Sequence, residues 1–349
     1  MSTATAAPPA TDKTKTKTKR KRIEIIIGGP ILGPQSEYAT ASKLEALVSL
    51  CQSHSITAID EAKIYAASEA FVGATRLGAQ GFRIDTKTPG GWEPGSSTRA
   101  GVVSNLRSSL QRLGVEQAHV FYLHAPDAAV ALDETLAGVN DAHQAGLFSR
   151  FGLSNFPPRE VERVYETARA NGYVLPTVYQ GCYSPVTRKP EDVLLPLLRR
   201  LGFSFYAYSP LAGGFLTKTK DQILAGVGRF NPNDMYGAMY RQMFGKPNYL
   251  DSLAAWAEIA DQEGVSRAEL AYRWVAWSSA LNEECGDALI LGCSSLDQMT
   301  QAVCGIEKGP LSDQAQSAID ALWAKVQHEA LMDNFEAAQL GRLDGPTAS

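Results

Sequence analysis

Eight short apolar runs, rich in β-branched and aromatic residues, alternate with longer segments of helical periodicity. This alternation is typical of repeated strand–helix units around a parallel sheet. Most runs end about thirty residues apart, as a closed eight-stranded barrel requires. A doubly wound sheet usually has fewer units and a glycine-rich first turn, and the sequence contains no GxGxxG motif. The sequence therefore predicts an α/β fold, a (β/α)8 TIM barrel, with strands EIIIGG (24–29), ITAID (56–60), FRIDTK (82–87), HVFYLH (119–124), SRFGLSN (149–155), LPTVYQ (175–180), SFYAYS (204–209) and ALILGC (288–293).

Segments between these runs have the apolar spacing of helices. One predicted helix covers 101–113 and stops at Gly114, and another covers 158–170, opened by two prolines. The gap between the last two runs is much longer than the others and leaves room for a long insertion. We expect residues 212–250, rich in Gly, Asn, Tyr and Arg, to form a mobile loop over the barrel mouth, where a cofactor clamp would lie.

Charge divides the chain unevenly. The net charge is −4, but residues 11–22 hold seven Lys or Arg and one Asp, which leaves −10 for the rest. An acidic body argues against a nucleic-acid-binding domain. We expect a disordered basic tail (1–22), a single barrel (23–340) and a flexible C-terminus (341–349). The tail is most simply a solvated tether, with nuclear import or binding to an anionic surface as the alternative.

The sequence lacks several motifs that would indicate a membrane segment, secretion, disulfide bonds or a metal site. No apolar run approaches the ~18 residues of a membrane helix, and the N-terminus has no apolar stretch typical of a secretory signal. Five cysteines form no CxxC pair, and five histidines form no HxxxH or HExxH pair. We therefore expect a cytoplasmic protein with no membrane segment, no disulfide framework and no metal site.

Reactive side chains lie where three neighbouring strands should end. The second, third and fourth runs end in Asp60, Lys87 and His124, and Tyr65 follows Asp60 by five residues. Because active sites of such barrels lie at the carboxyl ends of the strands, these four side chains should share one pocket. Taken singly, each has a structural alternative: a buried ion pair, a core histidine, a packed phenol. Their convergence at the one catalytic face makes coincidence a poor explanation.

Several motifs, in order, resemble those of the aldo-keto reductases over residues 23–336. Within that family, the chain looks most like the aflatoxin-aldehyde reductase branch, through LAGG (211–214), GRF (228–230), SSLDQ (294–298), GPL (309–311) and HE (328–329). The wider family motifs are IDEAKIYAASEAFVG (59–73), DTKTPG (85–90), YLHAPD (122–127), FGLSNF (151–156), VYQ (178–180), YSPLAGG (208–214) and ILGCSSLDQ (290–298).

The resemblance implies NADPH-dependent reduction of an aldehyde or ketone to an alcohol. Tyr65 would donate the proton, and Lys87 would lower the pKa of this phenol from its ordinary ~10. Asp60 would hold the ammonium, and His124 would orient the carbonyl oxygen. The implied NADPH/NADP+ contacts are Ser154, Asn155 and Gln180 on the carboxamide, Tyr208 against the nicotinamide ring, Ser209, Leu211, Gly213 and Gly292 along the cofactor, Arg229 as a phosphate clamp, and Ser294 and Gln298 at the 2′-phosphate.

Four departures from the family pattern stand out. Glu61 follows the expected catalytic Asp, and its side chain should point out of the barrel with little effect. Lys218 and Lys220 flank the position of a family lysine, so the role of that lysine cannot be assigned directly to either of them. Gln301 and Ala302 replace residues that often contact adenine in relatives. The C-terminal segment MDNFEAAQ (332–339) offers Glu336 where the branch commonly presents an arginine to acidic substrates.

The expected substrate is a neutral, apolar or aromatic small-molecule carbonyl compound. Its pocket walls should come from loops after the strands, including Trp92 and the 212–250 insertion. Pro30, Ile31, Tyr236 and Tyr240 are further candidates for the pocket walls. A homodimer is implied only by the resemblance.

Two other functions compete with this interpretation. Lys87 could serve an aldolase as a Schiff-base lysine, which would explain neither Tyr65 nor the later motifs. Alternatively, the chain could be an NADPH-binding regulatory subunit resembling the potassium-channel β-subunits, with little turnover.

Overall fold

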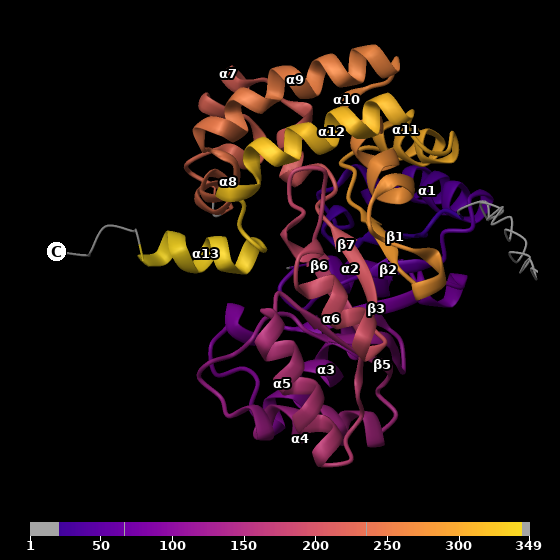
Figure 1. The fold of residues 1–349 in the computed structure, drawn as a ribbon. Helices are drawn as coiled ribbons and strands as arrows, with labels where there is room; N and C mark the ends of the chain where they lie inside the picture. The colour runs from indigo at the N-terminus through magenta and orange to yellow at the C-terminus, as the bar shows by residue number, and fades with distance from the viewer. Residues whose placement is uncertain (1–20, 66, 235, 344–349) are drawn as a thin grey trace, which may run out of the picture.

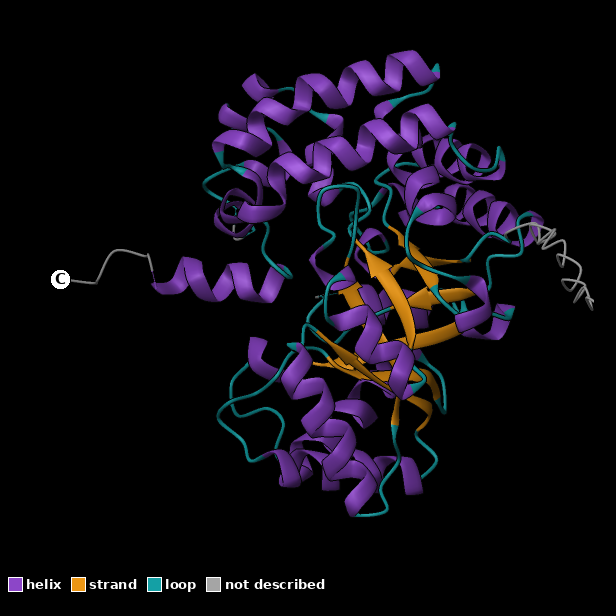
Figure 2. Cartoon of the chain, viewed as in Figure 1, coloured by secondary structure: helices purple, strands orange, loops and turns teal. Residues whose placement is uncertain are grey.

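A computed structural model describes residues 21–65, 67–234 and 236–343. Eight parallel strands form a closed barrel, in which each strand pairs with the next and the eighth pairs with the first. Figure 2 shows these strands at the centre of the molecule with helices around them. The predicted (β/α)8 barrel is confirmed, with strands β1 (Glu24–Gly28), β2 (Ala58–Asp60), β3 (Arg83–Thr88), β4 (Ala118–Leu123), β5 (Phe148–Ser154), β6 (Pro176–Cys182), β7 (Ser204–Tyr208) and β8 (Ala288–Leu291).

Helices follow the strands and cover the outside of the barrel (Figure 1). Successive helices pack side by side, as α2 does with α3 and α3 with α4. The described α-helices are α1 (Ala41–Ser53), α2 (Ser68–Ala74), α3 (Arg99–Leu113), α4 (Leu132–Gln144), α5 (Pro158–Ala170), α6 (Leu194–Leu201), α7 (Lys220–Leu224), α8 (Gly237–Phe244), α9 (Pro247–Glu263), α10 (Arg267–Arg273), α11 (Leu296–Glu307), α12 (Asp313–Val326) and α13 (Asn334–Leu343).

Local sequence signals account for the two helices that we predicted in detail. Helix α3 begins two residues before the predicted start, where the Thr98 hydroxyl accepts a hydrogen bond from the Gly101 N–H at 3.1 Å. It ends at Gly114, which adopts the left-handed conformation that terminates many helices. Helix α5 has the predicted bounds and begins at Pro158.

The barrel interior is a packed core rather than a pore. Alternate residues of six strands form a separate apolar cluster, because successive side chains of a strand point to opposite faces. Nearer the carboxyl ends of the strands, this cluster gives way to buried polar side chains, among them Asp60, Lys87 and Gln180. The cluster consists of Ile26, Ala58, Val120, Tyr122, Val178, Tyr206, Ala288 and Ile290.

The insertion between β7 and β8 is not the loop that we predicted. Residues 212–250 contain helices α7 and α8, the start of α9, and short 3₁₀ segments at Ala212–Thr217 and Gly228–Phe230. The reason is that aromatic residues of the insertion pack against one another, and burying their rings favours ordered helices. The composition of this segment, rich in Gly and Asn, did not reveal that cluster. In Figure 1 these helices gather together at the top of the view. The clustered rings are Phe215, Phe230, Tyr240, Phe244 and Tyr249.

Both ends of the chain were assigned to flexible segments. Helix α13 continues to Leu343, beyond the predicted boundary at residue 340. Residues 1–20 of the predicted tail and 344–349 of the predicted C-terminus lie outside the described residues. Within the described residues, no helix is long and apolar enough to cross a membrane. The same part of the chain holds no group of three or more His, Cys, Asp or Glu side chains that could bind a metal ion.

Candidate active site

A buried ion pair joins the ends of β2 and β3. The Lys87 Nζ lies 2.8 Å from both carboxylate oxygens of Asp60, and both side chains are almost fully buried. Gln180, on β6 across the barrel, donates its amide N–H to Asp60 Oδ1 at 2.8 Å. Asp60 therefore connects the predicted catalytic residues with a residue assigned to the cofactor.

Lys87 has a third hydrogen bond, to the backbone carbonyl of Glu61 at 2.7 Å. Its ammonium also lies 5.0 Å from the ring centre of Tyr65 and 5.5 Å from that of Tyr122. Burial would lower the pKa of Lys87, but attraction to Asp60 and Tyr65 outweighs it and raises the pKa above its ordinary value. Lys87 is thus held as a cation beside the phenol.

Tyr65 lies in the turn between β2 and α2, where its backbone N–H donates to the Ala62 carbonyl at 2.9 Å. Its ring meets that of His124 edge-on, with centres 5.8 Å apart. Desolvation raises the pKa of Tyr65 to about 12, although the positive charge of Lys87 acts in the opposite direction. The phenol is therefore protonated at neutral pH.

His124 directly follows β4 and is 6% exposed. Burial and the nearby Lys87 hold the pKa of its imidazole well below the ordinary value, so the ring is neutral. Its Nδ1 is buried without a partner among the described residues. A neutral imidazole beside a phenol can hydrogen-bond a carbonyl oxygen. The four predicted catalytic side chains do lie together, through the Lys87–Asp60 ion pair and the contacts of Tyr65 with Lys87 and His124.

Residues assigned to the nicotinamide lie at the ends of β5 and β7. The Asn155 side chain donates to the His124 carbonyl at 2.9 Å and to the Ser154 hydroxyl at 3.0 Å. The Tyr208 hydroxyl donates to Asn155 Oδ1 at 2.7 Å. Asn155 and Ser209 both have positive φ, of 58° and 56°, an uncommon conformation for residues other than glycine. Such local strain is often found at ligand-binding sites.

The turn after β7 leads into a pair of cations in the insertion. Gly213 has a φ of 66°, and an added Cβ there would lie 2.1 Å from the Tyr240 ring, so this close approach requires glycine. Tyr240 accepts a hydrogen bond from Arg229 at 3.0 Å. Lys218 is near enough to Arg229 that desolvation and this second cation lower its pKa. Lys220 instead pairs with Asp251 on the surface. The two lysines, which the sequence did not distinguish, therefore have different surroundings: Lys218 lies near Arg229, and Lys220 is paired on the surface.

The predicted 2′-phosphate segment is exposed at the start of α11. The Ser294 N–H and hydroxyl both donate to Gln298 Oε1, at 3.3 and 3.0 Å. Gly292, after β8, is also exposed. Of the two departures noted in this helix, Gln301 is exposed, whereas Ala302 is buried in the protein core. Ala302 is therefore a packing residue rather than an adenine contact.

The C-terminal segment supplies residues that the sequence analysis missed. The Phe335 ring contacts Trp92 edge-on, with centres 5.0 Å apart, and Trp92 in turn lies 6.1 Å from His124. The Asn334 N–H is 3.5 Å from the Tyr208 hydroxyl. Glu336 accepts from the Met332 N–H at 2.6 Å, at the start of α13. Phe335 could have been noted in the sequence as an aromatic residue. However, no pattern in the neighbouring residues indicated that it would pack against Trp92 at the barrel mouth.

Tyr240 is not a pocket wall, contrary to our prediction. It is 3% exposed and packs inside the insertion, whereas Tyr236 is 45% exposed. Ile31 lies near Gly292: a Cβ added to this glycine would be 3.7 Å from Ile31 Cγ2.

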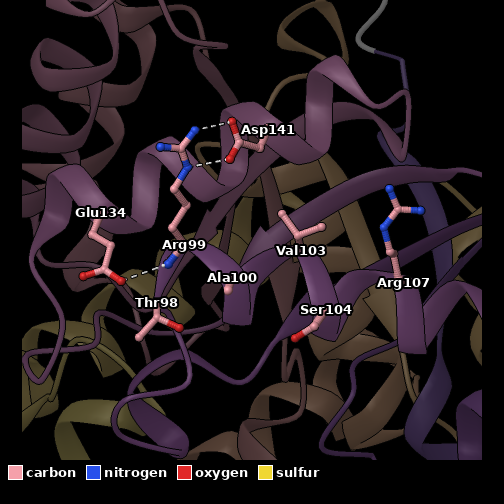
Figure 3. A pocket seen from close by; sticks show the side chains of 8 residues that line it. All are labelled: Thr98, Arg99, Ala100, Val103, Ser104, Arg107, Glu134 and Asp141. Atoms are coloured by element: carbon pink, nitrogen blue, oxygen red, sulfur yellow. Dashed lines mark hydrogen bonds and ion pairs between the residues drawn. The ribbon is translucent and has the colours of Figure 1, made fainter.

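A separate groove of about 610 Å³ lies along α3 and α4 (Figure 3). There Arg99 forms two hydrogen bonds with Asp141, and its backbone N–H donates to Glu134. None of the predicted catalytic or cofactor residues lines this groove. Three of its charged groups, Arg99, Asp141 and Glu134, already have partners.

Comparison with known proteins agrees with this geometry. A family model described as the aldo/keto reductase family matches residues 24–324. The oxidoreductase sirO of Leptosphaeria maculans is 36% identical over 304 residues, covering 86% of this chain and 91% of that protein. Human aflatoxin B1 aldehyde reductase members 2 and 4 are 39% and 38% identical, each over 78% of this chain, and over 79% and 86% of their own lengths. These matches confirm the resemblance found in the sequence. The chain therefore belongs to the aldo/keto reductase family, oxidoreductases that act on carbonyl groups with a nicotinamide cofactor.

Proposed function

We propose that this protein reduces an aldehyde or ketone to an alcohol with NADPH, and that Tyr65 donates the proton. The observation that carries this proposal is the Lys87 ammonium, bound to both oxygens of Asp60 and 5.0 Å from the Tyr65 ring. A cation beside a phenol favours the phenolate that is left after proton donation.

Reduction of a carbonyl group places negative charge on its oxygen, which must be stabilised and protonated. The Tyr65 hydroxyl is protonated and can supply that proton. As the proton leaves, Lys87 stabilises the negative charge that develops on Tyr65, while Asp60 keeps Lys87 charged and in position. Neutral His124 has a ring nitrogen, Nδ1, without a partner among the described residues, and its ring can orient the substrate oxygen.

The residues around the mouth fit a nicotinamide dinucleotide. Ser154, Asn155 and Gln180 offer amide and hydroxyl groups for a carboxamide, and Tyr208 offers a ring face. Reduced nicotinamide, when bound, supplies the hydride. Lys218 and Arg229 place two positive charges together, with no acidic side chain bonded to either among the described residues, as a pyrophosphate would require. Ser294 and Gln298 supply polar groups for the 2′-phosphate at the start of a helix, which supports NADPH.

The pocket chemistry favours a neutral, apolar or aromatic substrate. Trp92 and Phe335 form an aromatic wall that reaches His124. At the adjoining start of α13, Glu336 brings a carboxylate rather than a cation. An acidic aldehyde would therefore meet repulsion where it needs a positive partner.

The test is turnover of a panel of neutral and carboxylated aldehydes, including 4-nitrobenzaldehyde and succinic semialdehyde, with NADPH and separately NADH. The readout is absorbance of the reduced nicotinamide. Tyr65→Phe keeps the ring but removes the acid, so kcat should fall by about 10²- to 10⁴-fold. Tyr173→Phe, which alters a tyrosine just before β6 at the opposite end of the barrel, is the matched control and should keep wild-type rates.

Each part of the proposal has an outcome that contradicts it. Equal rates for Tyr65→Phe and wild type would exclude Tyr65 as the proton donor. A higher kcat/KM for succinic semialdehyde than for 4-nitrobenzaldehyde would overturn the substrate class. Tight NADPH binding without turnover of any aldehyde would instead support the regulatory-subunit function.

A further inference from the structure

Glu61 is a buried acid next to the catalytic residues, and the proposed mechanism does not use its side chain. The side chain is fully buried. Its carboxyl group lies against Gly29, so closely that a Cβ added to this glycine would be 2.3 Å from the carboxyl carbon. The hydrogen bond between Lys87 and Glu61 is to the Glu61 backbone carbonyl, not to the carboxyl group. The carboxyl group is therefore enclosed, with no cation hydrogen-bonded to it among the described residues.

The hydrogen bonds around this carboxyl group indicate its protonation state. The Ser68 hydroxyl lies 2.7 Å from Glu61 Oε1 and also 2.7 Å from the Gly29 carbonyl. A hydroxyl has one proton, so it can donate to only one of these acceptors at a time. If Glu61 is protonated, its own O–H donates to Ser68, and Ser68 donates to Gly29. Both short contacts are then satisfied.

An ionised Glu61 would leave the same site unbalanced. One of the two contacts with Ser68 would join two acceptors, and Glu61 Oε2 has no partner among the described residues. A buried, incompletely hydrogen-bonded charge is strongly unfavourable. Burial accordingly raises the pKa of Glu61 to about 8, despite the opposing effects of Ser68 and Lys87.

Among the described residues, the charged groups that affect the pKa of Glu61 lie on β2, α2 and β3. Asp60 on β2 and Glu69 on α2 both disfavour its ionisation, whereas Lys87 on β3 favours it. The positive charge of Lys87 also acts on Asp85 of β3, where it favours the ionised carboxylate. Glu69 forms an ion pair with Arg112 of α3. A second negative charge beside Asp60 would thus act on the same lysine that Tyr65 needs.

We propose that Glu61 is a positioning residue that is a neutral acid when the enzyme is active, and that its ionisation at alkaline pH weakens proton donation by Tyr65. As a neutral acid it ties the end of β2 to Gly29 and α2 through Ser68, and so holds the carbonyl that orients Lys87. Once ionised, it opposes the negative charge that develops on Tyr65. This inference rests on the proposed function for its catalytic part only.

The experiment compares wild type with Glu61→Gln, in which an amide N–H can replace the acid proton toward Ser68. In wild type, kcat should decline as pH rises through about 8, the ionisation range of Glu61. Because the glutamine cannot ionise, the variant should keep its rate to higher pH. At about one unit above that decline the two should differ by roughly tenfold, relative to their own neutral rates. Glu166→Gln, at an exposed site on α5, is the matched control and should follow wild type.

Thermal unfolding measured over the same pH range tests the protonation state without catalysis. Because the folded-state pKa of Glu61 is raised, its proton stabilises the folded protein fully below about 4.5, the ordinary pKa of the carboxyl. That contribution is lost as pH rises toward 8. The Tm of wild type should therefore fall relative to that of Glu61→Gln as pH rises toward 8, and the difference should then level off.

The two readouts separate the possible failures. A Tm difference that is independent of pH would show that Glu61 is already ionised, and would overturn the proposal. A pH-dependent Tm difference with superimposable rate profiles would overturn the positioning role. If no aldehyde is turned over, the proposed function fails, while the Tm comparison still decides whether Glu61 is neutral.

Discussion

The two sides of the barrel mouth differ in how completely they are built. At the ends of β2, β3 and β4, the side chains of Asp60, Lys87 and His124 are buried. Asp60 and Lys87 are hydrogen-bonded to each other, and the His124 ring packs against that of Tyr65. On the other side, the cations of the insertion and the start of α11 are more exposed. The Lys218 ammonium makes a long contact to the Gly214 carbonyl at 3.4 Å, and the Ser294 hydroxyl donates to nearby Gln298.

This difference teaches which half of the site depends on a ligand. The proposed catalytic groups are held by the barrel itself, as catalysis by positioned acids requires. The insertion and the start of α11, the proposed phosphate-binding side, have positive charge and polar groups, whose natural partner is an anion. Changes on the barrel side should therefore affect folding and chemistry, and changes on the insertion side should affect cofactor affinity.

The largest effect is expected from Lys87→Met. Removing the ammonium leaves Asp60 as a buried charge, which should lower the free energy of unfolding by about 3–5 kcal/mol. Lys308→Met, which breaks an exposed pair with Glu269, should cost about 1 kcal/mol or less. Urea unfolding at neutral pH measures both values. Similar losses for the two variants would contradict the view that the barrel side is pre-built around its ion pair.

A second, smaller effect is expected from the insertion. Lys218→Ala should raise the Kd for NADPH by about 10- to 100-fold, the value of one charge-assisted hydrogen bond, with little change in unfolding free energy. Lys220→Ala removes a surface cation that is already paired with Asp251, and should leave the Kd nearly unchanged. Fluorescence titration with NADPH measures both. If Lys220→Ala weakened binding more than Lys218→Ala, the assignment of the clamp would be reversed.

The smallest effect is expected at the junction of the two sides. Phe335→Ala removes the ring that packs on Trp92, so KM for an aromatic aldehyde should rise by up to about tenfold while kcat changes less. Phe335→Leu keeps an apolar side chain and should lie between the variant and wild type. Steady-state kinetics with 4-nitrobenzaldehyde provides the test. An unchanged KM in Phe335→Ala would remove the C-terminal segment from the substrate pocket.

Much of the fold and of the catalytic cluster was predictable, because both depend on repetition. Eight apolar runs at regular spacing place eight strands, and strand ends place reactive residues on one face. Asp60, Lys87 and His124 could thus be grouped from their positions in the chain alone. Tyr65 was less certain from spacing, and the family motif supported it.

Other features depended on contacts between distant segments. The sequence did not indicate which of Lys218 and Lys220 would lie beside Arg229. It also did not indicate that the insertion around Phe215 and Tyr240 would form helices instead of a polar loop. It also placed Glu61 outside the barrel without indicating that Gly29 and Ser68 would enclose it.

The sequence by itself determined the barrel, its strand order and the placement of Asp60, Lys87 and His124 together at the strand ends. These follow from period-two and helical patterns that act within a few residues. Only the tertiary structure decided that Phe335 reaches Trp92, that Lys218 lies beside Arg229, and that Glu61 is enclosed. The physical reason is that burial and electrostatic environment depend on which distant side chains share a small volume, and no local pattern records that.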